Sequence, residues 1–391
     1  MRLWFLLLIA LPVWAFASPD EAALGKNEGY PACKQQEFAA RGDVCLVGTL
    51  SHMAELYPAR KVAHGAPRDL KQADKSAALG ADDYMAKNRN TGLLVIKDGV
   101  ILAERYGYDR KPAERFHSYS MAKTVVGMLM GIAISEGKIA SIDDLAEKYV
   151  PELKGHPYGQ TTLRNLLTMS SGVAFSEHYD GKDDVTKLAM KTIGQQGPGG
   201  ADSVKDFTNR ERPAGIKFSY SSAESEVLGL VVRAATGKTL SDYLSEKIWI
   251  PMGAESDAYW LIDAGGYELG YMGINATLRD WGRLGVLLAN YGALDGKQII
   301  PAAWVKEATS VNAPHLEVGV ATQWNGYGYQ TWLIRKGTPM FALFGLRGQA
   351  VYVDPVSKLV IVHTAVYGVD GSERRAQFEY LFGTLKTLTA N

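Results

Sequence analysis

The sequence of 391 residues lacks the marks of several functional classes. Its 42 Lys and Arg residues balance 42 Asp and Glu residues, so it has no net charge with which to attract a nucleic acid or a membrane surface. Beyond the N-terminus, no apolar run is long enough to predict a membrane-spanning helix. The G-x-S-x-G motif of α/β-hydrolases is missing too, which excludes that fold.

The N-terminus has the pattern of a secretory signal peptide. Arg2 precedes an apolar run from Leu3 to Trp14, and the small-x-small triplet Ala15-Phe16-Ala17 follows it. This run is too short to span a bilayer comfortably. The sequence therefore predicts a signal peptide over residues 1–17, cleavage after Ala17, and a periplasmic or secreted product.

Cysteines and metal ligands are scarce. Two cysteines and seven histidines include no H-E-x-x-H motif and no paired C-x-x-C motif, so we expect neither a metal site nor a cofactor. Cys33 and Cys45 are the only cysteines, and in an exported protein they most simply form one disulfide that closes a short loop. Two free buried thiols are the alternative.

What the chain does contain is a strand-rich segment toward each end and helical patterns between them. Thr91 to Tyr108 is apolar on both sides of Asp98-Gly99, which is typical of a two-strand hairpin with a tight turn. Further strands are predicted over 327–334, 349–353 and 359–364, and a last helix over 372–388. Helical patterns occupy 121–136, 163–169, 224–235, 240–248 and 278–289.

This order predicts an α+β fold. An antiparallel sheet is built from both chain ends, with flanking helices and a mostly helical lobe inserted over about 140–275. Residues 26 to about 75 show no sustained period, and residues 18–80 are interpreted as an N-terminal extension that wraps around a domain over 81–391. Because about 370 mature residues exceed one typical core, we expect two closely packed lobes.

The sequence contains two S-x-x-K motifs, in which a lysine one helical turn after a serine can take its proton. A chain of this length should contain about one or two such matches by chance, so context has to choose between them. Ser135 ends a helical pattern with Gly137 as its cap, so Lys138 would lie outside the helix. Ser120 opens a helix that is apolar nearly all round, so Ser120 and Lys123 are the predicted pair.

The position of Ser120 suits a nucleophile. In the first turn of a helix its N–H has no helical partner and lies at the positive end of the dipole, so it can supply half of an oxyanion hole. Burial would lower the pKa of Lys123 toward the value that a general base near neutral pH needs. A helix N-cap serine and a snorkelling lysine are the alternative for this pair.

Two further segments carry candidate site residues. Tyr220 ends an extended segment at the mouth of a helix that Ser221 and Glu224 should cap, so its phenol can point into a cleft, although core packing is the commoner role of a tyrosine. Gly348 interrupts a strand pattern, which favours a strand edge lined by substrate. The N–H of Gln349 would then supply the second half of the oxyanion hole.

These motifs resemble, in order and spacing, the serine β-lactamase and penicillin-binding-protein superfamily: Ser120-x-x-Lys123, then Tyr220-Ser221-Ser222, then Leu346-Arg347-Gly348-Gln349. Within it, the chain is most similar to the 6-aminohexanoate-dimer hydrolase branch, which includes esterases, from about Leu50 to the C-terminus. The resemblance implies a β-lactamase/transpeptidase-like fold, an acyl-accepting Ser120, and proton transfer by the residues at positions 123 and 220. It also implies substrate contact by Tyr179.

The sequence departs from the superfamily at two places. β-Lactamases usually have Asn where this chain has Ser222, and Lys followed by Thr or Ser where it has Leu346-Arg347. Both missing groups help to hold a β-lactam, so small esters or linear amides are the expected substrates. Arg347 binds a substrate carboxylate if it faces the cleft, or else points to solvent. Ser222, Arg347 and Gly348 join Tyr179 as candidate substrate-binding residues.

The predicted function is hydrolysis of an ester or a linear amide through an acyl-enzyme on Ser120. The expected partner is the small-molecule substrate, with no nucleic acid and no membrane span. Two alternatives stay open. One is a penicillin-binding-type sensor or cell-wall-binding module that is acylated without turnover, and the other is a true β-lactamase or D-alanyl peptidase.

Overall fold

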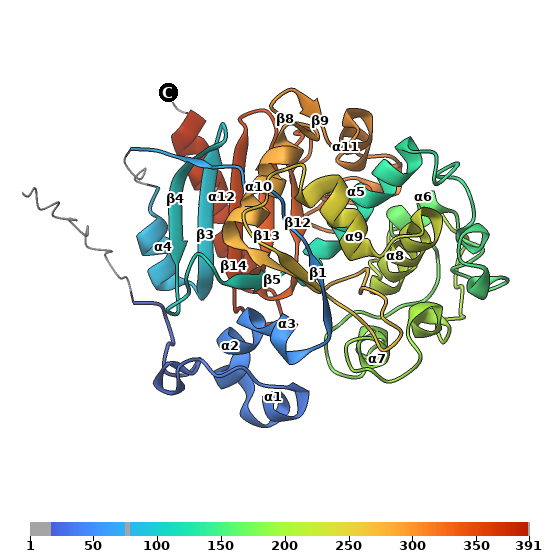
Figure 1. Ribbon diagram of the computed structural model, residues 1–391, viewed down its shortest axis with the longest axis horizontal. Coiled ribbons are helices and arrows are strands. Elements are labelled where there is room, and N and C mark those ends of the chain that lie inside the picture. Colours follow the sequence, from blue (N-terminus) through green and yellow to red (C-terminus); the bar gives the residue numbers. More distant parts are fainter. Residues whose placement is uncertain (1–16, 75–78, 390–391) are drawn as a thin grey trace, which may run out of the picture.

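The computed structural model describes residues 17–74 and 79–389. Its larger sheet has eight strands and occupies the left and middle of the view in Figure 1. Strands from both ends of the chain build this sheet, as the sequence predicts, because β14 pairs antiparallel with β3. The strand order is β10 (Gly326–Tyr327), β11 (Trp332–Leu333), β12 (Phe341–Phe344), β13 (Ala350–Asp354), β14 (Leu359–Ala365), β3 (Asn90–Lys97), β4 (Val100–Tyr106) and β2 (Lys71–Gln72).

The β3–β4 hairpin forms where Asp98-Gly99 predicts it. Both turn residues have positive φ, 51° at Asp98 and 76° at Gly99, which is the conformation that a tight two-residue hairpin turn requires. The predicted strand over 327–334 is instead two short strands joined by a turn, β10 and β11, and β12 is a strand that the sequence analysis did not identify.

A second sheet of four strands includes one strand from the N-terminal extension. Its order is β1 (Ala59–Val62), β6 (Ala258–Leu261), β7 (Ile274–Thr277) and β5 (Arg115–His117). The extension therefore contributes strand β1 to this sheet and strand β2 to the large one, where β2 runs parallel to β4. The large sheet is thus antiparallel except at this edge.

Helices cover both faces of the large sheet. On one face lie α4 (Ala81–Lys87) and α12 (Arg374–Thr389), which share an apolar cluster with β3, β13 and β14. On the other face lie α5 (Met121–Ser135) and α10 (Leu278–Ala289), which belong to the main core. The predicted helix over 278–289 has the observed bounds.

Of the remaining helices, those of the helical lobe lie to the right of the large sheet in Figure 1 and those of the N-terminal extension lie at the bottom. The helical lobe contains α6 (Leu163–Leu167), α7 (Asp184–Lys191), α8 (Ser222–Thr236) and α9 (Leu240–Leu244), the last followed by a π-helical turn over Ser245–Trp249. The extension contains α1 (Gln35–Arg41), α2 (Leu46–Ser51) and α3 (Met53–Leu56). Beside the main core lie the β8–β9 hairpin (Ala293–Leu294, Lys297–Gln298) and α11 (Ala302–Ala308).

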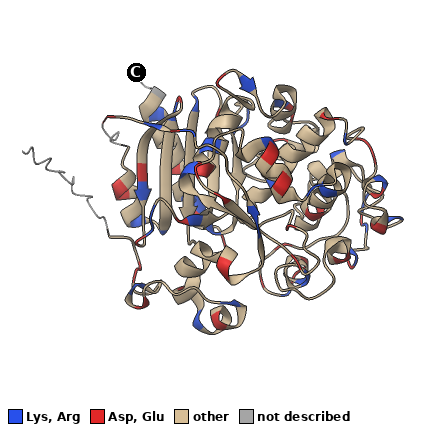
Figure 2. Cartoon of the chain, viewed as in Figure 1, with Lys and Arg blue, Asp and Glu red and all other residues tan. Residues whose placement is uncertain are grey.

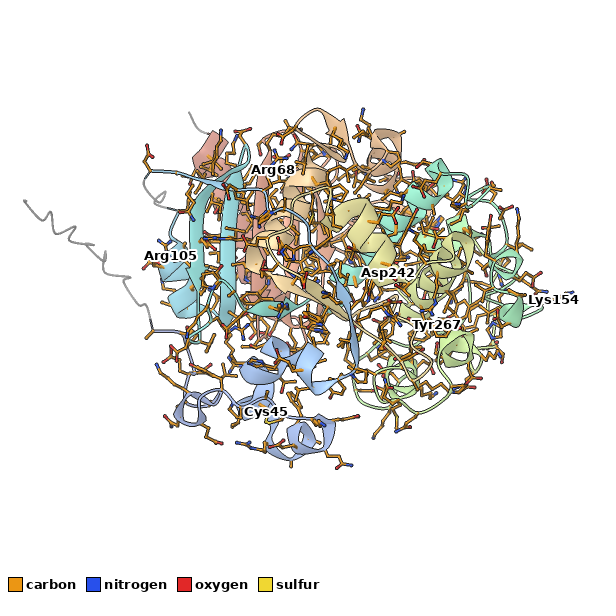
Figure 3. All side chains as sticks on the ribbon, in the orientation of Figure 1. Cys45, Arg68, Arg105, Lys154, Asp242 and Tyr267 are labelled. Atoms are coloured by element: carbon orange, nitrogen blue, oxygen red, sulfur yellow. A yellow bond between two sulfur atoms is a disulfide. The ribbon has the colours of Figure 1, made fainter. Side chains whose placement is uncertain are left out.

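The extension is closed by a disulfide between Cys33 and Cys45, whose Cα atoms are 5.7 Å apart (Figure 3). Both cysteines are buried. The predicted signal peptide lies outside the described residues except for Ala17, so that interpretation stays a prediction.

Charged residues of both signs are mixed over the elements of the fold (Figure 2), as the balanced composition implies. None of the helices within 17–74 and 79–389 is both long and apolar enough to cross a membrane.

Helix α5 is the central element of the core. All of its residues from Met121 to Ala133 are buried, as its apolar pattern predicts. Two of its glycines permit close approach: a Cβ at Gly131 would lie 2.1 Å from Cδ1 of Trp304, and the oxygen of Gly127 accepts a hydrogen bond of 2.9 Å from Nε1 of the same tryptophan. Because α5 is buried and packs closely against Trp304, the residue at its N-terminus has a fixed position.

Candidate active site

Ser120 stands at the N-terminus of α5, immediately after a sharp turn. The turn is anchored by Ser118, whose N–H donates to the oxygen of Ile274 at 2.8 Å and whose Oγ accepts from the N–H of Ile274 at 3.0 Å. Tyr119 has a φ of 43°, an unfavourable conformation for a tyrosine that redirects the chain into the helix. Ser120 is partly exposed, and its side chain makes no capping bond to the helix, so its hydroxyl is available for chemistry.

Lys123 lies one turn further along α5 and is only 1% exposed. Its Nζ donates to Oγ of Ser120 at 2.9 Å, to Oγ of Ser222 at 3.0 Å and to the oxygen of Tyr271 at 3.1 Å. Burial lowers the pKa of Lys123 to about 8, against the opposing effect of the carboxylates of Glu177 and Glu226. A lysine with this pKa exchanges its proton near neutral pH and touches the serine that would lose one.

Tyr220 completes the group that the sequence predicts. Its hydroxyl is hydrogen-bonded to Ser120, and its ring lies 4.9 Å from Nζ of Lys123. The ring also stacks on Trp332 with centroids 5.2 Å apart, which fixes its direction. Burial raises the pKa of Tyr220 above the ordinary range, so the phenol holds its proton and can donate it.

Glu177 is a site residue that the sequence analysis missed. One carboxylate oxygen accepts from Oγ of Ser222 at 3.0 Å and from the hydroxyl of Tyr179 at 2.6 Å, while the other accepts from the N–H of Ser222 at 2.9 Å. Ser222 and Tyr179, both predicted site residues, are therefore joined through this carboxylate. The only signal in the sequence was the position of Glu177 two residues before Tyr179.

The predicted capping box of α8 is wrong. Ser221 occupies the N-cap position, but its side chain makes no cap bond and instead lies 3.3 Å from the hydroxyl of Tyr158. Glu224 turns inward, where Oε1 accepts from Oγ of Ser171 at 2.6 Å and Oε2 has no hydrogen-bond partner. Burial raises the pKa of Glu224 to about 8, so this side chain is a neutral acid over much of the physiological range.

The segment Leu346–Gly348 approaches the serine turn from the sheet. A Cβ at the preceding Gly345 would lie 2.3 Å from the oxygen of Ser118, so only glycine permits this approach. Gly348 has a φ of 87°, and a Cβ there would lie 2.6 Å from the ring of Tyr367. The N–H of Gln349 reaches the oxygen of Leu346 only at 3.4 Å, a long contact that leaves it available to a stronger acceptor.

The sequence left two orientations open for Arg347, one facing the cleft and one pointing to solvent, and the structure shows its guanidinium bonded to protein atoms instead. Its Nη1 donates to the oxygen of Tyr367 at 2.9 Å, and the guanidinium is also hydrogen-bonded to the side chain of Tyr119. The arginine is thus half-buried and engaged with protein atoms beside the serine turn.

The second S-x-x-K motif lies at the other end of α5. Oγ of Ser135 donates to the oxygen of Ile132 at 2.8 Å, and the helix ends at Ser135 with Gly137 in a left-handed conformation. Fifteen residues of helix, about 22 Å, separate it from the group around Ser120. Across the described part of the chain, no cluster of three or more His, Cys, Asp or Glu side chains could hold a metal ion.

Fold and site together define the class of protein. A sheet built from both chain ends, a buried helix that opens with a serine and a lysine, and a helical lobe beside it define a serine hydrolase of the β-lactamase and penicillin-binding-protein type. The β-lactamase family model matches residues 81–381, and the chain belongs to that family.

Two similar proteins carry the same name. The chain is 26% identical to a 6-aminohexanoate-dimer hydrolase of Paenarthrobacter ureafaciens over 277 residues, which covers 69% of this chain and 70% of that protein. It also matches the solved structure of the "Putative 6-aminohexanoate-dimer hydrolase from Bacillus anthracis", with a TM-score of 0.79, 25% identity, and coverage of 88% of this chain and 95% of that one.

A more distant structure shows the fold alone. The penicillin-binding protein of Bacillus halodurans matches with a TM-score of 0.61 and 17% identity, and the match covers 77% of this chain and 99% of that one. The β-lactamase/transpeptidase-like fold expected from the motifs is thereby confirmed.

Proposed function

We propose that the protein hydrolyses an ester or a linear amide through an acyl-enzyme on Ser120. The observation that carries this proposal is the contact of 2.9 Å between Nζ of the buried Lys123 and Oγ of Ser120. A lysine whose pKa is about 8 is neutral in a useful fraction of molecules near neutral pH, and such a molecule can accept the serine proton.

The chemical steps follow from the positions of the groups. Lys123 takes the proton of Ser120 while Oγ attacks the carbonyl carbon, and the N–H groups of Ser120 and Gln349 stabilise the oxyanion. Tyr220 gives its proton to the leaving alcohol or amine as the carbonyl–heteroatom bond breaks, and Lys123 restores the proton of Tyr220. A water molecule activated by the same pair then attacks the acyl-enzyme and releases the acid.

The contacts of Ser222 and Arg347 favour esters and linear amides over β-lactams. Ser222 gives its one hydroxyl hydrogen to Glu177 and accepts from Lys123, so it has no donor left for the side-chain amide of a β-lactam. The guanidinium of Arg347 is already engaged with Tyr367 and Tyr119. The relatives named for 6-aminohexanoate-dimer hydrolysis suggest the same class, a linear amide.

The location that we propose is outside the cytoplasm. It rests on the signal-peptide pattern over 1–17 and on the pairing of Cys33 with Cys45, because disulfides persist in oxidising compartments.

The test is steady-state hydrolysis of a short-chain nitrophenyl ester by the purified mature protein. Ser120→Ala, Lys123→Ala and Tyr220→Phe should each lower kcat/KM by orders of magnitude with an unchanged melting curve, because residues that act as one unit lose activity together. Ser135→Ala, the matched control in the second motif, should stay near the wild-type value. Near-normal hydrolysis by Ser120→Ala would refute the proposal, and one stoichiometric burst without turnover would indicate a sensor.

A further inference from the structure

A buried polar network lies behind the segment that approaches Ser120. His363, 1% exposed, stands on β14 in the same alternation as Leu359 and Ile361, which face α12. Its Nδ1 lies 2.7 Å from the oxygen of Gly348, and Nε2 of Gln377 on α12 lies 2.8 Å from that same oxygen. Neither His363 nor Gln377 has a role in the chemistry described above.

The partners of the imidazole define which nitrogen carries the proton. Nε2 of His363 is bonded to the side-chain amide nitrogen of Asn90, which can only donate, and lies 3.0 Å from the hydroxyl of Tyr84 and 3.3 Å from that of Tyr367. Burial lowers the pKa of His363 to about 4, so the ring is neutral at working pH. The oxygen of Gly348 can only accept, so Nδ1 carries the proton and donates to it, and Nε2 is the acceptor.

Two donors thus converge on one carbonyl, that of the Gly348–Gln349 peptide. Nε2 of Gln377 also lies 2.8 Å from Nδ1 of His363, and because both nitrogens carry hydrogen, they share the oxygen of Gly348 as acceptor and do not bond to each other. No peptide bond is cis within 17–74 and 79–389, and in a trans peptide the C=O and the N–H point in opposite directions. The carbonyl of Gly348 points toward α12, so the N–H of Gln349 points toward the opposite face.

That opposite face is the one that holds the nucleophile. Val360 and Val362, which alternate with His363 along β14, pack in the core that contains α5. Gly345, just before the segment, approaches the oxygen of Ser118 so closely that a Cβ would lie 2.3 Å from it. The N–H of Gln349 is therefore directed to the side from which Ser120 attacks.

We propose that His363 and Gln377 are positioning residues that hold the Gly348–Gln349 peptide from behind and thereby present the N–H of Gln349 to the oxyanion. This inference rests on the proposed function. A carbonyl that accepts two hydrogen bonds makes the N–H of its own peptide a stronger donor, because successive hydrogen bonds polarise one another. It also prevents the peptide from rotating away when charge develops on the substrate oxygen.

The test separates this role from ordinary structural support. His363→Leu and Gln377→Leu should each lower kcat for the nitrophenyl ester on the order of tenfold, with KM within about twofold, because an oxyanion donor acts in the transition state. His363→Asn should restore most of kcat, since its amide nitrogen occupies the place of Nδ1 and can donate to Gly348. Tyr352→Phe is the matched control, because its hydroxyl touches Gln377 at 3.1 Å but not the peptide.

A second measurement tests the N–H of Gln349 as an oxyanion donor without turnover. Phenylboronic acid bonds to Oγ of Ser120 as a tetrahedral boronate, with one oxygen in the place of the oxyanion and the serine proton taken by Lys123. Its Kd should rise about tenfold in His363→Leu and Gln377→Leu and stay near the wild-type value in Tyr352→Phe. His363 lies on β14 and Gln377 on α12, so if one of the two leucine variants fails to fold, the other still tests the proposal.

The outcomes are distinct from those for the proposed function. If Ser120→Ala abolishes hydrolysis but His363→Leu and Gln377→Leu keep the kcat and boronate affinity of Tyr352→Phe, the inference is overturned and the proposed function stands. A change in KM alone, or no recovery with Asn at position 363, would also overturn it. Hydrolysis by Ser120→Ala would instead remove the proposed function.

Discussion

Replacing the Glu177 carboxylate by an amide should move the pH dependence of the enzyme in a defined direction. Glu177 and Lys123 both bond to Oγ of Ser222 at 3.0 Å, so the two charges are no more than about 6 Å apart. At an effective dielectric constant of about 20, Coulomb's law gives roughly 3 kcal/mol for this pair, or about 2 pH units. The negative charge favours the ammonium form of Lys123 and raises its pKa.

Glu177→Gln removes that charge and keeps the size of the side chain. The pKa of Lys123 should fall, and the acid limb of kcat/KM, which reports the free enzyme, should move about 1 to 2 units toward lower pH. The other groups that face the lysine are Tyr220, Tyr271 and the buried Glu226, and all three stay in place. The assay is kcat/KM for a nitrophenyl ester across the pH range in which the protein stays folded.

The control is Glu224→Gln, which makes the same chemical change in another glutamic acid of the same lobe. Glu224 contacts Ser171 rather than Ser222, so the limb should stay in place. If the acid limb of kcat/KM is unchanged in Glu177→Gln, or moves toward higher pH, Lys123 is not the titrating base. A limb that moves equally in both variants would refute the specific contact with Ser222.

Three further results are expected. Thiol titration of the unfolded, unreduced mature protein should find no free thiol, because Cys33 and Cys45 are joined, and two thiols per chain would contradict this. Burial raises the pKa of Glu224 in the folded protein to about 8, against an ordinary 4.5, so the stability that its protonated form contributes is fully present below about pH 4.5 and is lost as the pH rises toward 8. Between about pH 6 and about pH 8, the unfolding free energy of the wild type, measured by urea titration, should therefore fall by about 2 kcal/mol more than that of Glu224→Gln. A nitrophenyl ester should exceed a chromogenic cephalosporin in kcat/KM, because Ser222 has no free donor and the guanidinium of Arg347 is engaged with Tyr367 and Tyr119. A tenfold preference for the cephalosporin would contradict this.

Strong local signals account for the parts of the fold that the sequence predicted. The Asp98-Gly99 turn specifies its hairpin because both residues accept positive φ, and the helix over Leu278–Ala289 has a full apolar stripe between clear ends. The second sheet was missed because its strands are only three or four residues long, and β7 is buried at all four positions, so it has no alternation to detect.

Tertiary contacts account for the parts of the site that the sequence missed. Glu177 is joined to the site through Ser222, which lies 45 residues later in the chain. The helical start at Ser221 and Glu224 has the spacing of a capping box, yet the carboxyl group turns to Ser171 instead. In each case a partner distant in sequence decides where the carboxyl group lies, because a buried or half-buried carboxyl group must find hydrogen bonds wherever the fold supplies them.

The two S-x-x-K motifs show what spacing alone contributes to a catalytic site. Both place a lysine three residues after a serine, and both involve helix α5. Only the first has the serine at the positive end of the helix and the lysine inside the core, where burial lowers its pKa to about 8. At the second, the serine bonds to its own helix and the lysine follows the helix end. The spacing alone therefore does not make a site: the contact between serine and lysine, the burial of the lysine and the helix polarity at the serine all depend on where the helix begins and how the whole chain packs.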